Sequence, residues 1–161
     1  MEAVSATDLR VDSRLAKFSQ GSVVVLTALA FLLSWPPLVL ITGLLLAWSA
    51  LWPAAGPFAL FYRHVLVASG LLKPRLVEDD PAPHRFAQGV GATLLLVAGL
   101  LLLLTSATLA GWALDLLVFV LSFVNLTVGF CAGCLVYYYL GKIGLVPRVR
   151  YEGGFHWRGV R

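Results

Sequence analysis

The feature that most constrains this chain is a set of four long apolar segments in two pairs, with a short break inside each pair and a longer stretch between the pairs. They cover residues 21–35, 38–52, 86–106 and 112–140 of the 161. A helix needs roughly 20 mostly apolar residues to cross a bilayer, and the last two segments reach that length on their own. Because 60% of the residues are hydrophobic and only 12% are charged, a soluble enzyme, a disordered chain and a disulfide-stapled secreted module are excluded. We expect an all-α membrane protein.

The first two segments lie on either side of Pro36 and Pro37, which predict a tight turn between two helices. Each segment is slightly short for a full crossing, so we expect the first helix to start near Leu15 and the second to continue past Pro53. With residues 86–140 forming a second pair, the sequence predicts four transmembrane helices as two tandem helix hairpins. For the first pair, a re-entrant hairpin that does not cross the membrane is the alternative.

The segments around these helices are expected to lie outside the hydrocarbon. Residues 56–72 place Phe58, Phe61 and Tyr62 near one face and Arg63 off it, which predicts an amphipathic helix lying in the interface after the second span. We expect one membrane domain over residues 1–161, made of a polar N-terminal segment (1–14), the first hairpin with its interfacial helix (15–72), a cytoplasmic loop (73–85), the second hairpin (86–140) and a basic C-terminal tail (141–161).

The orientation follows from the twelve Lys and Arg residues. They precede the first helix, lie between the second and third helices, or follow the fourth, and the two short turns contain none. Loops rich in Lys and Arg stay in the cytoplasm, so four crossings would put both termini and the central loop there. The net charge of +4 therefore indicates membrane orientation, and we expect the lipid bilayer rather than nucleic acid as a partner.

An internal repeat is predicted from two short matching segments. Residues 17–21 (Lys-Phe-Ser-Gln-Gly) precede the first helix, and residues 85–89 (Arg-Phe-Ala-Gln-Gly) precede the third. With one alignment shift, Gly56 falls opposite Gly129. Both halves would start in the cytoplasm, so the repeats would be parallel and related by a twofold axis along the membrane normal. Chance recurrence in a composition rich in Leu, Ala and Gly is the alternative.

Cys131 and Cys134 are the main candidates for chemistry. Two cysteines three residues apart suit thiol–disulfide exchange, because an attacking thiolate needs a resolving partner nearby. On a regular helix their Cβ atoms would lie about 5–6 Å apart, so a disulfide would need a local distortion, which Gly129 and Gly133 permit. The same glycines form Gly-x-x-x-Gly, a packing motif of membrane helices. Chemistry, helix packing and a metal site stay open for this pair, and a metal site would need further ligands.

Other polar residues in the predicted spans give weaker signals. Asp115 is the only acidic residue in a span, and an intramembrane carboxylate is a candidate functional group. Its place close to Trp112 favours contact with water, or a helix cap, at the outer interface. Asn125 could line a polar path, although a hydrogen bond to a neighbouring helix is the favoured interpretation. The sequence indicates no cofactor, and it contains no phosphate-binding loop or Ser/His/Asp set.

Three segments resemble a bacterial family of small four-helix membrane proteins of unknown function. They are Arg-Phe-Ala-Gln-Gly at residues 85–89, Gly-Pro-Phe at 56–58 and Phe-Cys-Ala-Gly-Cys at 130–134. The resemblance covers residues 11–140. It implies a place in the bacterial inner membrane and an association with thioredoxin-like or sulfurtransferase proteins.

Three functions remain open from the sequence. The leading hypothesis is a membrane-embedded accessory protein for thiol or sulfur chemistry, using Cys131 and Cys134 near the cytoplasmic face. There, a resting dithiol is expected, because that compartment keeps thiols reduced. The second is a non-catalytic assembly or scaffold subunit of a larger membrane complex. The third is a small transporter for a sulfur species, formed by a homo-oligomer. Whether the chain is an enzyme stays open.

Overall fold

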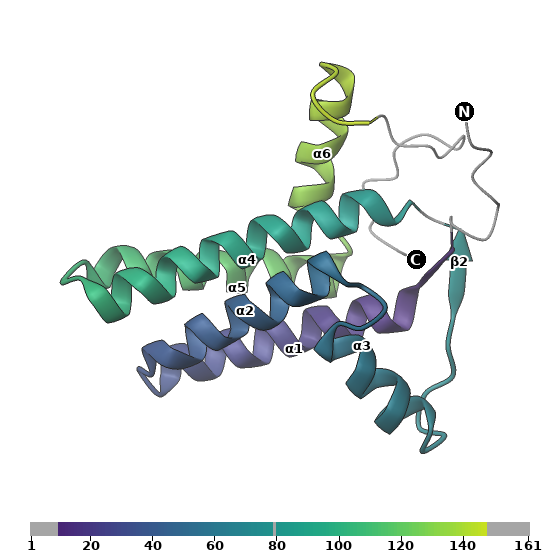
Figure 1. Ribbon diagram of the computed structural model, residues 1–161, viewed down its shortest axis with the longest axis horizontal. Coiled ribbons are helices and arrows are strands. Elements are labelled where there is room, and N and C mark those ends of the chain that lie inside the picture. The colour runs from purple at the N-terminus through teal and green to yellow at the C-terminus, as the bar shows by residue number, and fades with distance from the viewer. Residues whose placement is uncertain (1–9, 79, 148–161) are drawn as a thin grey trace.

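The computed structural model describes residues 10–78 and 80–147, and four long helices dominate it (Figure 1). Helices α1 (Ser13–Leu32), α4 (Pro81–Leu104) and α5 (Thr108–Val128) are long and apolar enough to cross a membrane. Helix α2 (Pro36–Leu51) is equally apolar but shorter, at 16 residues. Pro36 and Pro37 occupy its first turn, where a missing N–H costs nothing. The chain therefore has the helices of a membrane protein.

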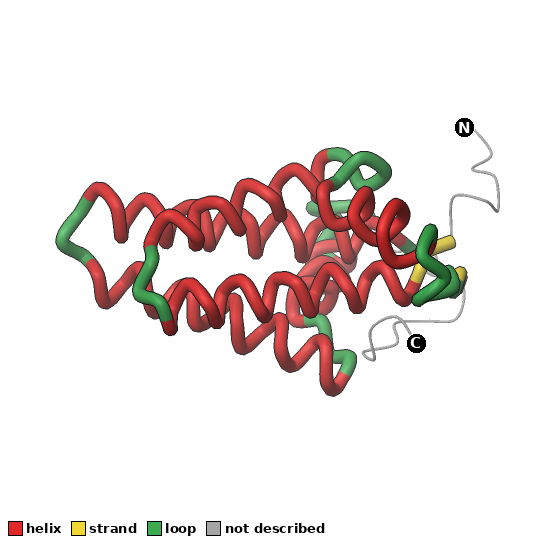
Figure 2. The backbone as a smooth tube through the Cα atoms, turned by 90° about the horizontal axis from the view of Figure 1, so that it is seen from below, coloured by secondary structure: helices red, strands yellow, loops and turns green. Residues whose placement is uncertain are grey.

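The four helices lie side by side, with the turns that follow α1 and α4 at the same end (Figures 1 and 2). Helix α2 packs along α4, and α1 packs along α5. Two glycines allow the close approach of α2 to α4, because a Cβ added at Gly43 would lie 3.0 Å from the Leu96 nitrogen and one at Gly99 would lie 2.9 Å from the Leu40 Cβ. The core between the helices consists of Val23, Ala30, Val39, Leu46, Phe58, Ala92, Leu95, Ala98 and Val118.

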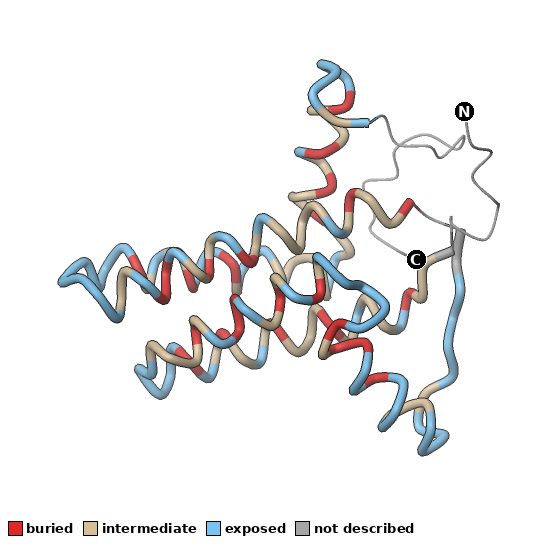
Figure 3. Tube along the Cα trace, in the orientation of Figure 1, coloured by how far each residue is buried: buried red, intermediate tan, exposed pale blue. Residues whose placement is uncertain are grey.

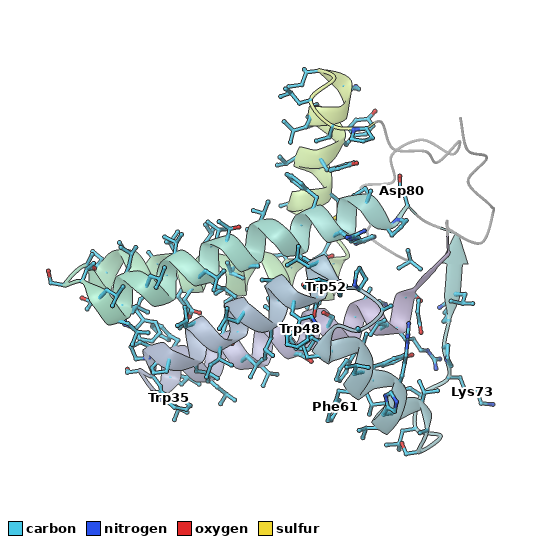
Figure 4. All side chains as sticks on the ribbon, in the orientation of Figure 1. Trp35, Trp48, Trp52, Phe61, Lys73 and Asp80 are labelled. Atoms are coloured by element: carbon cyan, nitrogen blue, oxygen red, sulfur yellow. A yellow bond between two sulfur atoms is a disulfide. The ribbon has the colours of Figure 1, made fainter. Side chains whose placement is uncertain are left out.

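The exterior of the bundle is apolar, which is the reverse of a soluble protein. Buried residues follow the inner faces of the helices, and exposed positions cover the outside (Figure 3). Trp35, Trp48 and Trp52 are at least half exposed, and Figure 4 labels all three along α2 and its ends. Small and polar residues such as Thr27 and Thr42 are fully buried instead. Lipid is the solvent that suits this surface.

Short elements close the end of the bundle that lies opposite the turns. After α2, helix α3 (Pro57–Phe61) continues into the π-helix η2 (Tyr62–Val67), where the sequence predicted one longer interfacial helix. Strand β1 (Arg10–Asp12) pairs antiparallel with β2 (Leu76–Glu78). The carboxylate of Asp12 accepts hydrogen bonds from the backbone N–H groups of Arg14 and Arg75, and so ties the start of α1 to the loop before α4.

Tyr62 of η2 is buried against this corner, with 1% of its surface exposed. Its hydroxyl has no hydrogen-bond partner among the described residues. Burial raises the pKa of Tyr62 above its ordinary value, and the nearby negative charge of Asp12 raises it further.

Two boundaries predicted from the sequence were wrong. Helix α4 begins at Pro81, so the last five residues of the predicted 73–85 loop are helical, with Asp80 as N-cap and its carboxylate accepting from the Ala82 N–H. The single fourth helix predicted over residues 112–140 is two helices, because α5 ends at Val128 and α6 (Ala132–Lys142) starts after a break. Of the predicted tail, residues 148–161 lie outside the described residues.

The pairing of elements agrees with the predicted repeat. In each half a long helix is followed by a second helix and then by a shorter one: α1, α2 and α3 in the first, α4, α5 and α6 in the second. Helix α3 packs against α1 as α6 packs against α4, and the contacts α1–α5 and α4–α2 exchange in the same way. A twofold axis along the bundle requires this pattern. The superposition of the halves stays a prediction.

Candidate functional site

The site forms where the chain breaks after α5. Gly129 is the C-terminal cap of α5, with φ of 75° in the left-handed region, and its N–H still bonds to the Asn125 carbonyl. Glycine adopts this conformation without the steric cost that a Cβ would add. Helix α6 then starts in a new direction, across the long axis of α4 and α5 (Figure 1). The break places both cysteines at the beginning of a helix rather than inside one.

Cys131 and Cys134 are joined by a disulfide, with their Cα atoms 5.2 Å apart. Cys131 is the N-cap of α6 in extended conformation, and its sulfur accepts a hydrogen bond from the Cys134 N–H at 3.2 Å. The regular-helix geometry considered from the sequence does not apply, because one cysteine lies before the helix and the other in its first turn. The pair is oxidised here, whereas a resting dithiol was expected.

The helix start has a chemical consequence for these sulfurs. Unpaired N–H groups and the helix dipole give the first turn of a helix a positive potential, which stabilises a thiolate. Both sulfurs are shielded from solvent, since Cys131 is 6% and Cys134 8% exposed. The disulfide is therefore buried at a place where its reduction would release a thiolate that the helix N-terminus stabilises.

His84 is the third member of the site. Its Nδ1 lies 3.8 Å from the Sγ of Cys134. The ligand atoms of His84, Cys131 and Cys134 all lie within 4.8 Å of one another, a spacing that a reduced pair could use to bind a metal ion. In the disulfide neither sulfur is a thiolate, so the oxidised state offers only the imidazole. An imidazole beside a sulfur can also give or take a proton.

Gly133 allows α6 to approach α4. A Cβ added at Gly133 would lie 2.5 Å from the Cβ of Ala87 and 2.8 Å from its Cα, which is too close for any side chain. Gly133 thus lies in the contact between α6 and α4, whereas Gly129 terminates α5. Phe86 and Tyr137 add a ring contact between the same two helices, with centroids 5.5 Å apart.

A small pocket of about 80 Å³ adjoins the disulfide. Its polar lining comes from Gln20 of α1, Ser122 and Asn125 of α5, and Cys131. Asn125 and Cys131 therefore line the same pocket, a relationship that the sequence did not predict. Of the two cysteines, Cys131 is the one among the lining residues.

Asp115 is far from the cysteines and takes no part in this site. From Asp115 to the end of α5 at Val128 the helix rises by roughly 20 Å. The structure also contradicts the favoured interpretation of Asp115 as a wet or capping residue: its side chain is fully buried, and the cap of α5 is Ala107.

The sequence analysis missed His84. Its neighbours Asp80, Pro81 and Pro83 suggested a solvated loop, yet Asp followed by Pro is also a helix start, with the acid as N-cap and Pro in the first position. That signal would have moved the beginning of α4 and put His84 in its first turn. The contact with Cys134 spans 50 residues and has no signature in the sequence.

No curated protein and no solved structure matches this chain. A match to a known family is found over residues 11–142, which contain every element from α1 to α6 as well as Cys131, Cys134 and His84. The chain belongs to the family described as domain of unknown function DUF4395.

Proposed function

We propose that this protein exchanges thiols and disulfides at one face of a membrane, with Cys131 and Cys134 as the reacting pair. The observation that carries the proposal is the position of the disulfide at the start of α6, with the Cys131 sulfur accepting the Cys134 N–H and His84 beside Cys134. A structural disulfide needs neither a histidine nor a stabilised sulfur. A pair that cycles gains from both, because its thiols must ionise and regain protons.

The proposed arrangement in the membrane has four crossings, with α2 as the fourth. Helix α2 is short, but it packs against both α1 and α4. At its C-terminal end, the Arg85 side chain donates hydrogen bonds to the carbonyls of Ala50 and Leu51. The described Lys and Arg side chains belong to the starts of α1 and α4, to η2 and the loop after it, and to the end of α6. These elements lie at the end of the bundle opposite the turns after α1 and α4 (Figure 1). The distribution of Lys and Arg therefore supports a cytoplasmic location for that end of the bundle, and thus for the cysteines.

The proposed reaction starts with a dithiol partner of the thioredoxin-like class. A partner thiolate attacks the Sγ of Cys131, the sulfur that borders the pocket, and forms a new S–S bond as the Cys131–Cys134 bond breaks. Cys134 leaves as a thiolate, with the electron pair of the broken bond, and takes a proton from His84. The second partner thiolate then attacks the partner's own sulfur in the mixed disulfide and releases Cys131 as a thiolate, which the Cys134 N–H stabilises.

The exchange balances without another reagent. The partner loses two electrons and two protons and becomes a disulfide, while Cys131 and Cys134 gain the two electrons. One proton passes through His84 to Cys134, which becomes a thiol, and the other goes to solvent while Cys131 is a thiolate, or to Cys131 when that thiolate is protonated. His84 gives a proton to Cys134 and then receives one from a thiol of the partner, so the imidazole returns to its starting state. The same steps in reverse would let the reduced pair deliver electrons to an oxidised partner.

Trapping a mixed disulfide tests the proposal. In the Cys134→Ser variant, Cys131 keeps its place but loses its resolving partner, so it should form a stable adduct with a thioredoxin-like protein that carries an activated disulfide. Cys131→Ser is the matched control, and it should trap far less because Cys134 does not border the pocket. Wild-type protein in native membranes should react with a maleimide only after reduction.

The scaffold and transporter hypotheses predict different results. If neither cysteine forms an adduct and reduction leaves maleimide labelling unchanged, the disulfide is structural and the scaffold hypothesis replaces exchange. Flux of a sulfur compound into vesicles that contain the purified protein would support the transporter. The pocket beside Cys131 has room for only a few water molecules at about 80 Å³.

A further inference from the structure

The carboxylate of Asp115 is the least explained group in the bundle. Its side chain has 0% of its surface exposed. Neither Oδ1 nor Oδ2 has a hydrogen-bond partner among the described residues. An ionised carboxylate in such a place costs several kcal/mol unless a positive charge or hydrogen-bond donors compensate it. Asp115 has neither, so something other than a side chain must neutralise it.

Two threonines share the level of Asp115 in the bundle. The rings of Phe31 and Trp112 are in contact, with centroids 5.5 Å apart. Thr27 comes four residues before Phe31, and Asp115 three residues after Trp112. Each therefore lies about one helical turn deeper in the bundle than the ring contact, on the side away from the loops after α1 and α4. Across the turn between α1 and α2, the antiparallel register sets Thr42 opposite Thr27. Leu95 of α4 completes this layer, and all four side chains have 0% exposure.

The repeat relates the members of this layer. The offset that sets Gly56 opposite Gly129 also sets Thr42 opposite Asp115. The offset of the segments before α1 and α4 sets Thr27 opposite Leu95. In the predicted repeat, Asp115 therefore corresponds to a neutral threonine in the first half of the chain.

The layer contains hydrogen-bond acceptors but no free donor. The hydroxyl of Thr27 donates to the Val23 carbonyl at 2.8 Å, and that of Thr42 donates to the Leu38 carbonyl at 2.7 Å. Their oxygens can still accept a hydrogen bond but have no hydrogen left to give. A protonated carboxyl group, which has a hydrogen to donate, suits a layer of acceptors, and an ionised one does not.

Charged groups on the surrounding helices are too distant to compensate Asp115. On α1 they are Arg14 and Lys17, which lie at least ten residues from Thr27, about 15 Å along the helix. On α4 the nearest are His84 and Arg85, at least ten residues from Leu95. Helix α2 contains no charged residue, and α5 contains none besides Asp115.

We propose that Asp115 is an intramembrane binding site for a proton, which the carboxyl group holds when the four helices are packed as they are here. A metal cation fits the site less well. Na⁺, like other hard cations, needs several oxygen ligands, and this layer provides two hydroxyl oxygens, while backbone carbonyls of the helices are already bonded. The proton needs only the carboxylate. This site is independent of the cysteine pair.

Infrared spectroscopy of the full chain in lipid vesicles tests this inference. At neutral pH the wild-type protein should show the C=O band of a protonated carboxyl group, and the band should shift when aspartate is labelled with ¹³C. The band should be absent from Asp115→Asn, a variant of nearly the same shape. Asp80→Asn, at the N-cap of α4, is the control and should keep the band. Its absence from the wild-type protein at neutral pH would overturn the proposal, whether or not the variant folds.

A hydrophobic carbodiimide supplies a second measurement. It takes the proton of a carboxylic acid onto its nitrogen while the carboxylate oxygen bonds to its central carbon, so it labels protonated groups in apolar surroundings. The label should map to Asp115, and Na⁺ at constant pH should not change its rate of incorporation. Protection by Na⁺ would overturn the proton assignment and identify a metal-cation site instead.

Discussion

The Nδ1 of His84 lies 3.8 Å from the Sγ of Cys134, although 50 residues separate the two in the chain. The contact exists because α4 starts at Pro81 and because α6 turns back onto that first turn. Two features of the sequence, an N-terminal helix signal before His84 and a helix break at Gly129, thus combine to place an imidazole beside a disulfide.

Replacing His84 with Gln is expected to slow the exchange reaction while leaving the disulfide in place. Without the imidazole, the leaving Cys134 thiolate lacks its proton donor, and general acid catalysis is typically worth about 10²-fold or more. The rate of reduction by a small dithiol, followed by maleimide labelling over a range of pH, measures the effect. His64→Gln is the control, since His64 lies on η2 away from the cysteines. Equal rates for the two variants would remove His84 from the mechanism.

Gly133→Ala should destabilise the protein by about 1–3 kcal/mol, the usual cost of forcing a side chain into packed atoms. The new Cβ would meet Ala87 and push α6 off α4. Gly89→Ala is the matched control: it lies on the same helix as Ala87, nothing lies within 4 Å of its added Cβ, and the helix should tolerate or favour alanine. Thermal unfolding in detergent compares the two. A similar melting temperature for both would contradict the close contact between α6 and α4.

Gly129→Val should lower the fraction of protein that forms the Cys131–Cys134 disulfide at a fixed ratio of reduced to oxidised glutathione. The left-handed conformation of residue 129 costs an L-residue roughly 1–2 kcal/mol, and a β-branched side chain suffers most. The chain would relieve this cost by extending α5, which separates the sulfurs. Gly129→Asn should retain most of the disulfide, because asparagine tolerates φ near +75°. Equal loss in both variants would mean that φ is not the cause.

Alkaline pH should weaken the fold through Tyr62. Its pKa is raised in the folded state, first by burial and then by Asp12, so above the ordinary value of 10.0 the unfolded chain loses the phenol proton while the folded chain still holds it. The stability that this group contributes is complete below that pH and is lost as the pH rises through the folded-state pKa. Tyr62→Phe should remove this part of the loss. Tyr139→Phe, at an exposed site, should not.

The predicted orientation can be checked with reporter fusions. A fusion at Asp80 and one after Arg161 should both report the cytoplasm, and one inserted in the turn after α4, at Ser106, should report the opposite side. A cytoplasmic signal from Ser106 would reduce the number of crossings and contradict the four-span arrangement.

Helices α1, α2, α4 and α5 were predictable because a membrane imposes a length and an apolar composition that a single sequence displays. The break at Gly129 was not, since residues on both sides of it are apolar, and a glycine inside such a segment can either pack against another helix or end its own helix. The same limit applied to Asp115. Its neighbours in sequence place it near the end of a span, whereas its complete burial depends on how α5 packs against α1 and α4.

All nine residues of the hydrophobic core precede Gly129, and α6 contributes none of them. Helix α6 packs on α4, and its disulfide joins only its own N-cap to its first turn, so α6 should be able to detach while the rest of the fold persists. Such subglobal opening costs less free energy than global unfolding. Amide hydrogens of α6 would then exchange with solvent sooner than those of α4 or α5. Opening of this kind would let a protein as large as a thioredoxin-like partner reach sulfurs that are almost completely covered in the closed form.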